Sequence, residues 1–208
     1  MKILAIGAHF DDIELGCGGS LLKWKSQGHQ ITLFTATLSG YRDPSGKLIR
    51  SEEHAAMEGR KSAKLVGAEL IEGKLSTFAV EFNESLNAIL VDILARVKPD
   101  LLLTHWTEDT HHDHRQLALA SLHCARRVPR ILMYESNWYV GEGLFNARYF
   151  VDITSTYAGK IELLRIFKSE HDRVGESWER FAAAKSEMLG LTAGVSRAEG
   201  FQVVKWLE

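Results

Sequence analysis

The strongest constraint on the fold is a regular alternation of short apolar runs with helical patterns along the chain. Residues 3–8 are apolar throughout, and residues 31–36 are rich in β-branched and aromatic side chains. Strands that are apolar on both faces are typical of a parallel sheet that helices cover on both sides. The alternation therefore predicts an α/β fold with a mostly parallel central sheet.

Strands are predicted at residues 3–8, 31–36, 69–71, 101–105, 131–135 and 149–153, with a last short strand at 201–204. Residues 20–26 are predicted to lie in the helix that follows the first strand, and further helices are predicted at residues 51–67, 85–97, 114–126, 157–167 and 178–188, with a polar loop at 39–50. Ser51 and Gly67 mark the ends of the second helix, since serine favours the N-cap and glycine the C-terminal end. We expect a doubly wound, Rossmann-like sheet with strand order 3-2-1-4-5-6. Its ligands should bind beyond the carboxyl ends of strands one and four.

Composition favours one domain that spans residues 1–208 and acts on a small molecule. Three prolines and no Ser/Gly-rich tract leave no evident linker. The formal net charge of -2 provides no basic stripe for nucleic acid. Cys17 and Cys124 are too few for a disulfide framework and are expected to be free thiols. No run long enough for a signal peptide or a membrane span is evident, so we expect a cytoplasmic protein.

Two segments at the predicted switch point concentrate histidine and carboxylate residues. The chain reads AHFDDIELGCGG after the first strand and HWTEDTHHDHR after the fourth, and these segments hold five of the nine histidines. So many acidic and imidazole groups in one place would repel one another or stay unpaired without a cation. Imidazole and carboxylate together suit zinc, although other divalent ions also fit. The sequence therefore predicts a metal site with about three protein ligands and an open position.

Other common sites lack their sequence signals. The glycines of residues 16–19 do not have the G-x-G-x-x-G spacing of a dinucleotide site. Neither a G-x-x-x-x-G-K-[ST] phosphate loop nor a G-x-S-x-G nucleophile elbow occurs in the sequence. Nucleotide binding through these loops and serine catalysis are therefore disfavoured.

The two segments resemble the A-H-P-D-D-x-E and H-P-D-H motifs of the PIG-L/LmbE-like N-acetylglucosaminyl deacetylase family. The segment RSEEHAAMEGRKSAKLVGAE is similar to the arginine-led helix that follows the second strand of the family. YES at residues 134–136 and RAEGF at residues 197–201 also resemble later family segments. The paired motifs at their expected distance are highly specific, and the resemblance spans most of the chain.

The resemblance implies a role for each residue of the two motifs. The implied metal ligands are His9, Asp12 and His114. Asp11 is implied as the general base that takes a proton from water. His111 is implied to assist the tetrahedral intermediate, and Asp113 to orient its ring. Such a pair would keep the imidazole protonated near neutral pH, ready to donate to the oxyanion or the leaving amine.

Three further residues are candidates for substrate binding. Arg50 matches the sugar-contacting arginine of the family, although a solvated cation before a helix is an equal alternative. Trp106 is the best candidate for stacking on a sugar ring. Asp109 stands where some members place a tyrosine that polarises the carbonyl, so that role stays open. Phe10 and His112 replace prolines of the family motifs and are expected to change loop stiffness and pocket shape.

These observations predict a zinc-dependent hydrolase that removes an N-acyl group, expected to be acetyl, from an amino sugar or sugar conjugate. An amidase or deformylase acting on a different amide, such as a thiol-sugar conjugate, is the alternative at the same site. A non-catalytic sugar- or nucleotide-binding module is the alternative from another class. Asp11 argues against that module, because binding alone needs no base beside a metal. Members of such families often assemble, which leaves a homo-oligomer open.

Overall fold

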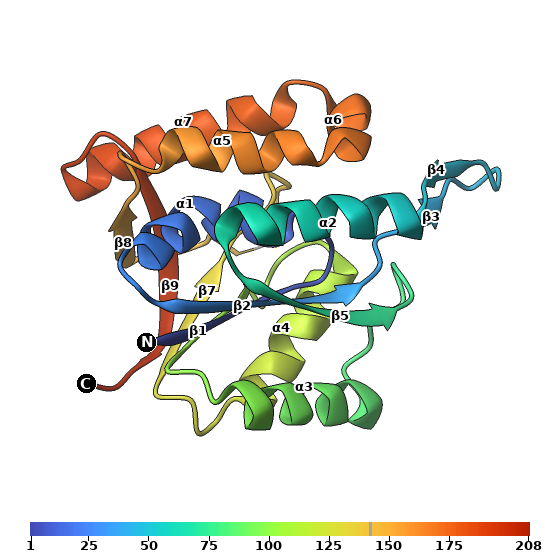
Figure 1. Ribbon diagram of the computed structural model, residues 1–208, viewed down its shortest axis with the longest axis horizontal. Coiled ribbons are helices and arrows are strands. Elements are labelled where there is room, and N and C mark those ends of the chain that lie inside the picture. The colour runs from blue at the N-terminus through green and yellow to red at the C-terminus, as the bar shows by residue number, and fades with distance from the viewer. Residues whose placement is uncertain (142) are drawn as a thin grey trace.

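A central sheet of seven strands lies between two layers of helices (Figure 1). The computed structural model describes residues 1–141 and 143–208. The strands of this sheet are β1 (Lys2–Gly7), β2 (Gln30–Thr37), β5 (Glu69–Leu75), β6 (Leu101–His105), β7 (Arg130–Tyr134), β8 (Tyr149–Asp152) and β9 (Ala198–Trp206). Because β1 pairs in parallel with both β2 and β6, the switch point lies between β1 and β6, as predicted.

Helices cover both faces of the sheet (Figure 1). One face carries α1 (Asp12–Ser26), α2 (Glu52–Val66), α5 (Tyr157–Ile166), α6 (Lys168–Val174) and α7 (Ser177–Ala193), and the other carries α3 (Glu84–Val97) and α4 (His112–Cys124). Successive side chains of β1 pack against the helices on opposite faces of the sheet. Ile3 and Ala5 join the core cluster that includes α1 and α5, whereas Leu4 and Ile6 join the cluster with α3 and α4. This two-sided burial confirms the predicted α/β architecture.

The last part of the predicted strand order is wrong. The observed order is β5-β2-β1-β6-β7-β9-β8, so β9 lies between the fifth and sixth predicted strands. β9 runs antiparallel to both β7 and β8. An antiparallel strand near the edge of a mostly parallel sheet is common, because it needs no crossover helix. The sequence pattern of residues 201–204 indicated a strand but contained no signal for its partners.

Local signals placed some elements correctly and missed others. The Ser51 side chain accepts a hydrogen bond from the His54 amide, and Gly67 ends α2 in the left-handed conformation, as predicted. The predicted polar loop at 39–50 instead contains a short hairpin of β3 (Tyr41–Arg42) and β4 (Leu48–Arg50). The helix α6 was not predicted, and α1 begins at Asp12, inside the first motif. No helix within the described residues is both long and apolar enough to cross a membrane.

Candidate metal centre and active site

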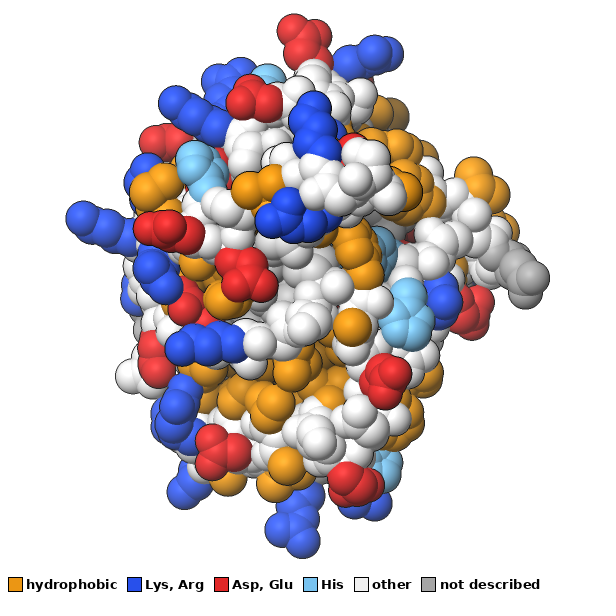
Figure 2. Space-filling model, turned by 90° about the vertical axis from the view of Figure 1, so that its right-hand side faces the viewer, with side chains coloured by type: hydrophobic (Ala, Val, Ile, Leu, Met, Phe, Trp, Pro, Cys, Tyr) orange, Lys and Arg blue, Asp and Glu red, His pale blue; other side chains and the backbone are white. Residues whose placement is uncertain are grey.

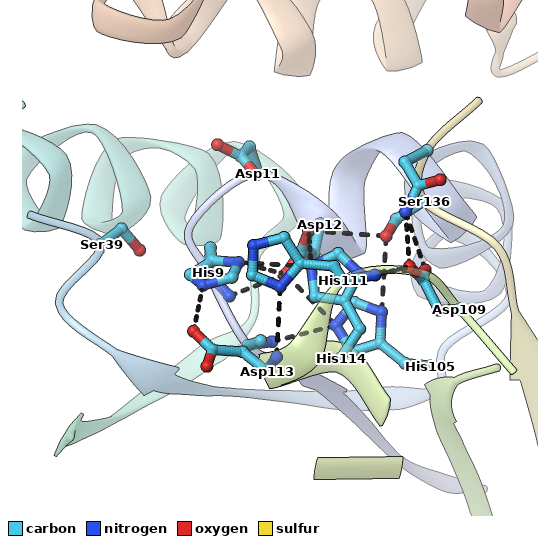
Figure 3. Close-up of polar contacts among 12 residues, drawn as sticks. His9, Asp11, Asp12, Ser39, His105, Asp109, His111, Asp113, His114 and Ser136 are labelled. Carbon is cyan, nitrogen blue, oxygen red and sulfur yellow. Dashed lines mark hydrogen bonds and ion pairs between the residues drawn. The ribbon is translucent and has the colours of Figure 1, made fainter. Parts of the chain in front are cut away.

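The two predicted segments meet at the carboxyl ends of β1 and β6 (Figure 3). They border a cavity of about 280 Å³, whose lining includes His9, Asp11, Asp12, His111 and His114. Figure 2 looks onto the side of the molecule towards which β2 and β5 point in Figure 1. It shows positive and negative side chains interspersed, with apolar side chains and histidine between them. A cavity on a face of mixed charge suits a small molecule better than a polyanion.

The three predicted metal ligands form a triangle at the base of the cavity. The nitrogens His9 Nδ1 and His114 Nε2 lie 3.3 Å apart. The Asp12 carboxylate lies 3.4 Å from the His9 nitrogen through Oδ2 and 3.2 Å from the His114 nitrogen through Oδ1. A tetrahedral zinc ion with bonds of about 2.0–2.1 Å needs ligand atoms roughly 3.3 Å apart. The donor types suit zinc, and the spacing of the two nitrogens and of one Asp12 oxygen from each of them is close to this value.

A carboxylate holds the far nitrogen of each imidazole ligand. His9 Nε2 lies 2.9 Å from Asp113 Oδ2, and His114 Nδ1 lies 3.0 Å from Asp109 Oδ2. Metal-binding histidines usually donate their second N–H to a carboxylate, which fixes the tautomer and raises the basicity of the ligand nitrogen. Both rings therefore turn their free nitrogen towards the same point between them, as Figure 3 shows.

The electrostatics of this cluster favour positive charge. Burial lowers the pKa of His9, but the hydrogen bonds with Asp113 and Asp12 outweigh it and raise the pKa to about 9. Burial also lowers the pKa of His114, but Asp12 and Asp109 outweigh this effect and raise the pKa to about 10. Burial raises the pKa of Asp12, yet His114 and His105 hold it well below its usual value. A site that stabilises two protonated imidazoles can equally stabilise a divalent cation.

Asp11 lies beside the metal triangle with its carboxylate set apart from the imidazole cluster (Figure 3). Its Oδ2 accepts a hydrogen bond from Arg50 Nη1 at 3.1 Å. Its backbone has φ of 122°, a conformation that non-glycine residues rarely adopt and that is common at functional sites. Burial raises the pKa of this carboxyl well above its usual value, although Arg50 acts in the opposite direction. The geometry leaves Asp11 free to accept a proton.

The prediction that Asp113 orients the His111 ring through its carboxylate is wrong. That carboxylate contacts His9 and the backbone amides of Phe78 and Val80. The His111 ring is held instead by the Asp113 backbone amide, which donates to Nδ1 at 3.2 Å. At the start of α4, the Asp113 side chain therefore points to His9, which follows β1, and not to the His111 ring.

The expected protonation of His111 also differs. Burial, together with the charge on His114 and His9, lowers the pKa of His111 to about 4. The ring is therefore neutral at pH 7, with its proton on Nε2 because Nδ1 accepts from the backbone. A neutral imidazole in this tautomer can donate a hydrogen bond into the cavity but cannot act there as an imidazolium acid.

His105 is buried beneath the cluster and was not among the predicted site residues. The Ala8 amide donates to its Nε2 at 3.0 Å, which occupies the lone pair that a metal would need. Burial lowers the pKa of His105, so the ring is neutral. It stacks on His114 with ring centroids 3.9 Å apart and planes 12° from parallel. The stacking supports His114, and the His105 Nε2 also lies 3.2 Å from Asp12 Oδ2, so that Asp12, His105 and His114 form a second group close enough to hold a metal ion.

The structure changes the expectation for each candidate substrate-binding residue. Arg50 lines the cavity and is only 3% exposed, so the alternative of a solvated cation is wrong. Asp109 is buried and holds His114, which excludes it from the position of a carbonyl-polarising side chain. Trp106 is buried against Phe145 and is absent from the cavity lining, so it offers no surface to a sugar.

Two cavity residues, Ser136 and Asn137, were not among the predicted site residues, although Ser136 ends the YES segment noted in the sequence. Asn137 follows β7 and donates through Nδ2 to both oxygens of Asp109, at 2.7 and 2.8 Å. Ser136 lies between Asp12 and His105, with its Oγ 3.5 and 3.4 Å from them. The position of both residues at the carboxyl end of a neighbouring parallel strand was the available signal.

Comparison with known proteins identifies the family. The PIG-L family profile, described as GlcNAc-PI de-N-acetylase, matches residues 4–125. The chain belongs to the PIG-L family. The uncharacterized deacetylase YaiS of Escherichia coli K12 is 32% identical over 145 residues, which cover 65% of this chain and 75% of YaiS. The family assignment confirms the predicted resemblance and the prediction of an N-deacetylase.

Two more distant comparisons extend over almost the whole chain. The diacetylchitobiose deacetylase of Thermococcus kodakarensis is 23% identical over 98% of this chain and 83% of its own length. The structure of GalB, the 4-carboxy-2-hydroxymuconate hydratase of Pseudomonas putida KT2440, matches with a TM-score of 0.79 at 19% identity, covering 98% and 96% of the two chains. A hydratase with the same fold means that site chemistry, and not the fold, must decide the reaction.

Proposed function

We propose that this PIG-L protein uses a divalent cation, expected to be zinc, to remove the acetyl group from an N-acetylated amino sugar or sugar conjugate. The observation that carries the proposal is the triangle of His9, Asp12 and His114, with Asp11 unattached to it at its side. The relative named for diacetylchitobiose supports an amino-sugar substrate. The cavity of about 280 Å³ is close to the lower end of small-molecule sites, roughly 300 Å³, and suits a single sugar residue.

The residues around the triangle divide the chemistry between them. When bound, zinc would polarise the amide carbonyl and make water more acidic. Asp11 takes a proton from the attacking water, whose oxygen bonds to the carbonyl carbon. His111 donates from its Nε2–H to the carbonyl oxygen as negative charge develops there. Asp11 then delivers its proton to the nitrogen as the C–N bond breaks, which releases acetate and the free amine.

Arg50 has a supporting part in this scheme. Its guanidinium holds the Asp11 carboxylate at 3.1 Å and is itself paired with Glu58 at 3.3 Å. The pairing keeps Asp11 in a fixed position, while burial raises the pKa of its carboxyl well above the usual value and so makes it a stronger base. Arg50 therefore positions the base from inside the cavity wall.

The test is the release of acetate, or of formate from formamides, from a panel of amides by the zinc-loaded and the metal-free protein. The panel contains N-acetylglucosamine, N,N'-diacetylchitobiose, an acyclic N-acetyl amine and the corresponding formamides. We expect acetate release from the sugars by the zinc-loaded protein alone. Full activity of the metal-free protein would contradict the metal role. Hydrolysis restricted to non-sugar amides would favour the amidase alternative, and sugar binding without hydrolysis would favour the binding module.

A further inference from the structure

The turn between β5 and α3 places an aromatic side chain at the mouth of the cavity. Phe78 lines the cavity and is 55% exposed. Its ring centroid lies 5.7 Å from that of His111 and 5.5 Å from that of Tyr41, which meets it edge-on. Isolated exposed apolar residues are normal on protein surfaces. Phe78 differs because it lies beside the reaction centre.

The backbone of Phe78 has an unfavourable conformation. Its φ of 65° is in the left-handed region, which is unfavourable for a side chain with a Cβ atom. The amides of Phe78 and Val80 donate to the Asp113 carboxylate at 2.7 and 3.1 Å. The same carboxylate holds His9 at 2.9 Å. The turn and the metal ligand therefore share one buried anchor, which fixes the phenyl ring relative to the metal triangle.

Two residues of the cavity lining carry buried polar atoms that lack a partner in the described part of the chain. Thr77 Oγ1, next to Phe78, is buried and has no hydrogen-bond partner among the residues that the structure describes, and Arg50 Nε is in the same state. Both residues line the cavity. Leaving buried polar atoms unpaired is costly, so a ligand that supplies hydrogen bonds would be favoured there. A purely apolar ligand would leave both atoms unpaired.

We propose that Phe78 is the stacking platform for the pyranose ring of the substrate, and that Thr77 binds one of its hydroxyl groups. This inference rests on the proposed function and names residues that determine its sugar specificity. A pyranose has an apolar C–H face and a polar rim, which match an aromatic ring flanked by hydroxyl and guanidinium groups. The platform stands next to His111, so a sugar stacked on it can present its acetamido group to the metal triangle.

The test compares kcat, KM and zinc content of Phe78→Ala, Phe78→Tyr and Thr77→Val with those of the unmodified protein. Phe82→Ala is the matched control, since Phe82 is 41% exposed, contacts His123 and is absent from the cavity lining. We expect Phe78→Ala to raise KM for N-acetylglucosamine about tenfold, the effect of losing one good contact, with kcat within twofold and zinc content unchanged. Phe78→Tyr should restore KM, Thr77→Val should raise it several-fold, and Phe82→Ala should leave it unchanged.

An acyclic N-acetyl amine separates stacking from a general effect on the site. Phe78→Ala should leave its hydrolysis unchanged, because that substrate has no ring. An equal loss of hydrolysis on both substrates, an unchanged KM for the sugar, or a loss of bound zinc in Phe78→Ala would each refute the proposal that Phe78 is a stacking platform.

Binding of N-acetylglucosamine to the Asp11→Asn variant, followed by saturation-transfer NMR, distinguishes this proposal from the proposed function. We expect binding that weakens about tenfold when Phe78→Ala is added. Binding of this kind without acetate release by the unmodified protein would overturn the proposed function alone. Acetate release that is insensitive to Phe78→Ala would overturn the platform alone. No binding and no release with any sugar of the panel would overturn both.

Discussion

Zinc binding to the metal-free protein should depend steeply on pH, because the two imidazole ligands must lose protons first. The pKa of His9 is raised to about 9 and that of His114 to about 10, so both rings are protonated at pH 7 in the metal-free state. Zinc requires the neutral ligand. The two pKa values lie about 2 and 3 units above pH 7. Removing these protons opposes zinc binding at pH 7, and each unit of pKa above the working pH makes this removal about tenfold less favourable.

The sign follows from which state holds the protons. The metal-free state binds about two more protons than the zinc-loaded state, so raising the pH favours zinc. Apparent zinc affinity should therefore increase by about 100-fold per pH unit between pH 6 and 8, and level off above pH 10. The same groups stabilise the metal-free fold fully below pH 6.5, their unfolded value. That stabilisation is lost as pH rises through 9 and 10.

Competition with a chelator of known affinity measures the pH dependence, and calorimetry in buffers of different ionisation enthalpy counts the protons released. We expect about two protons per zinc bound near pH 7, one for each imidazole. Release of less than one proton, or an affinity that is constant from pH 6 to 8, would refute the reasoning. The variant Asp113→Asn should lower the number released, since the carboxylate that raises the pKa of His9 loses its charge.

Four substitutions test the assigned roles. Asp11→Asn should keep zinc and lower turnover by roughly 10²–10⁴, the usual contribution of a general base; unchanged turnover would exclude Asp11 as the base. His111→Ala should keep zinc and lose turnover, whereas zinc loss would make His111 a fourth ligand. Asp109→Asn should weaken zinc affinity by roughly 10–100-fold, measured by chelator competition, because it removes the charge that holds His114. Phe78→Gly should be more stable to urea than Phe78→Ala by about 1 kcal/mol, because glycine accepts a positive φ; equal stability would show that the turn relaxes.

The architecture, and the meeting of the two segments that form the candidate metal site, could be predicted because their signals are local or follow from topology. Apolar strand runs and the cap residues Ser51 and Gly67 describe short segments, and local physics determines these. The switch-point rule then brings residues 9–12 and 111–114 together, although they are about a hundred residues apart in sequence. The partners of β9 depend on which strand edges remain open after the rest of the sheet has formed, and no local pattern encodes this.

The residues that surround the predicted ligands could not be predicted for a similar reason. Asn137, Thr77 and Phe78 are single residues outside any motif, and their importance lies in what faces them. The assignment of Asp113 to His111 followed their closeness in sequence. In the structure, the adjacent residues Asp113 and His114 point in different directions: Asp113 contacts His9, and His114 contacts Asp12. The motifs and the topology predicted which residues enter the site. They did not predict which side chains form hydrogen bonds with one another.

The start of α4 explains why the second motif contains so many titratable residues. Asp109 holds His114 from the preceding turn and also accepts a hydrogen bond from the His111 amide at 2.8 Å. Asp113 holds His9 and the Phe78 turn, while His114 points to the metal triangle. Each carboxylate thus fixes one imidazole ligand together with one segment of the cavity wall. Loss of either charge should therefore disturb metal affinity and substrate binding together, whereas loss of Phe78 should disturb substrate binding alone.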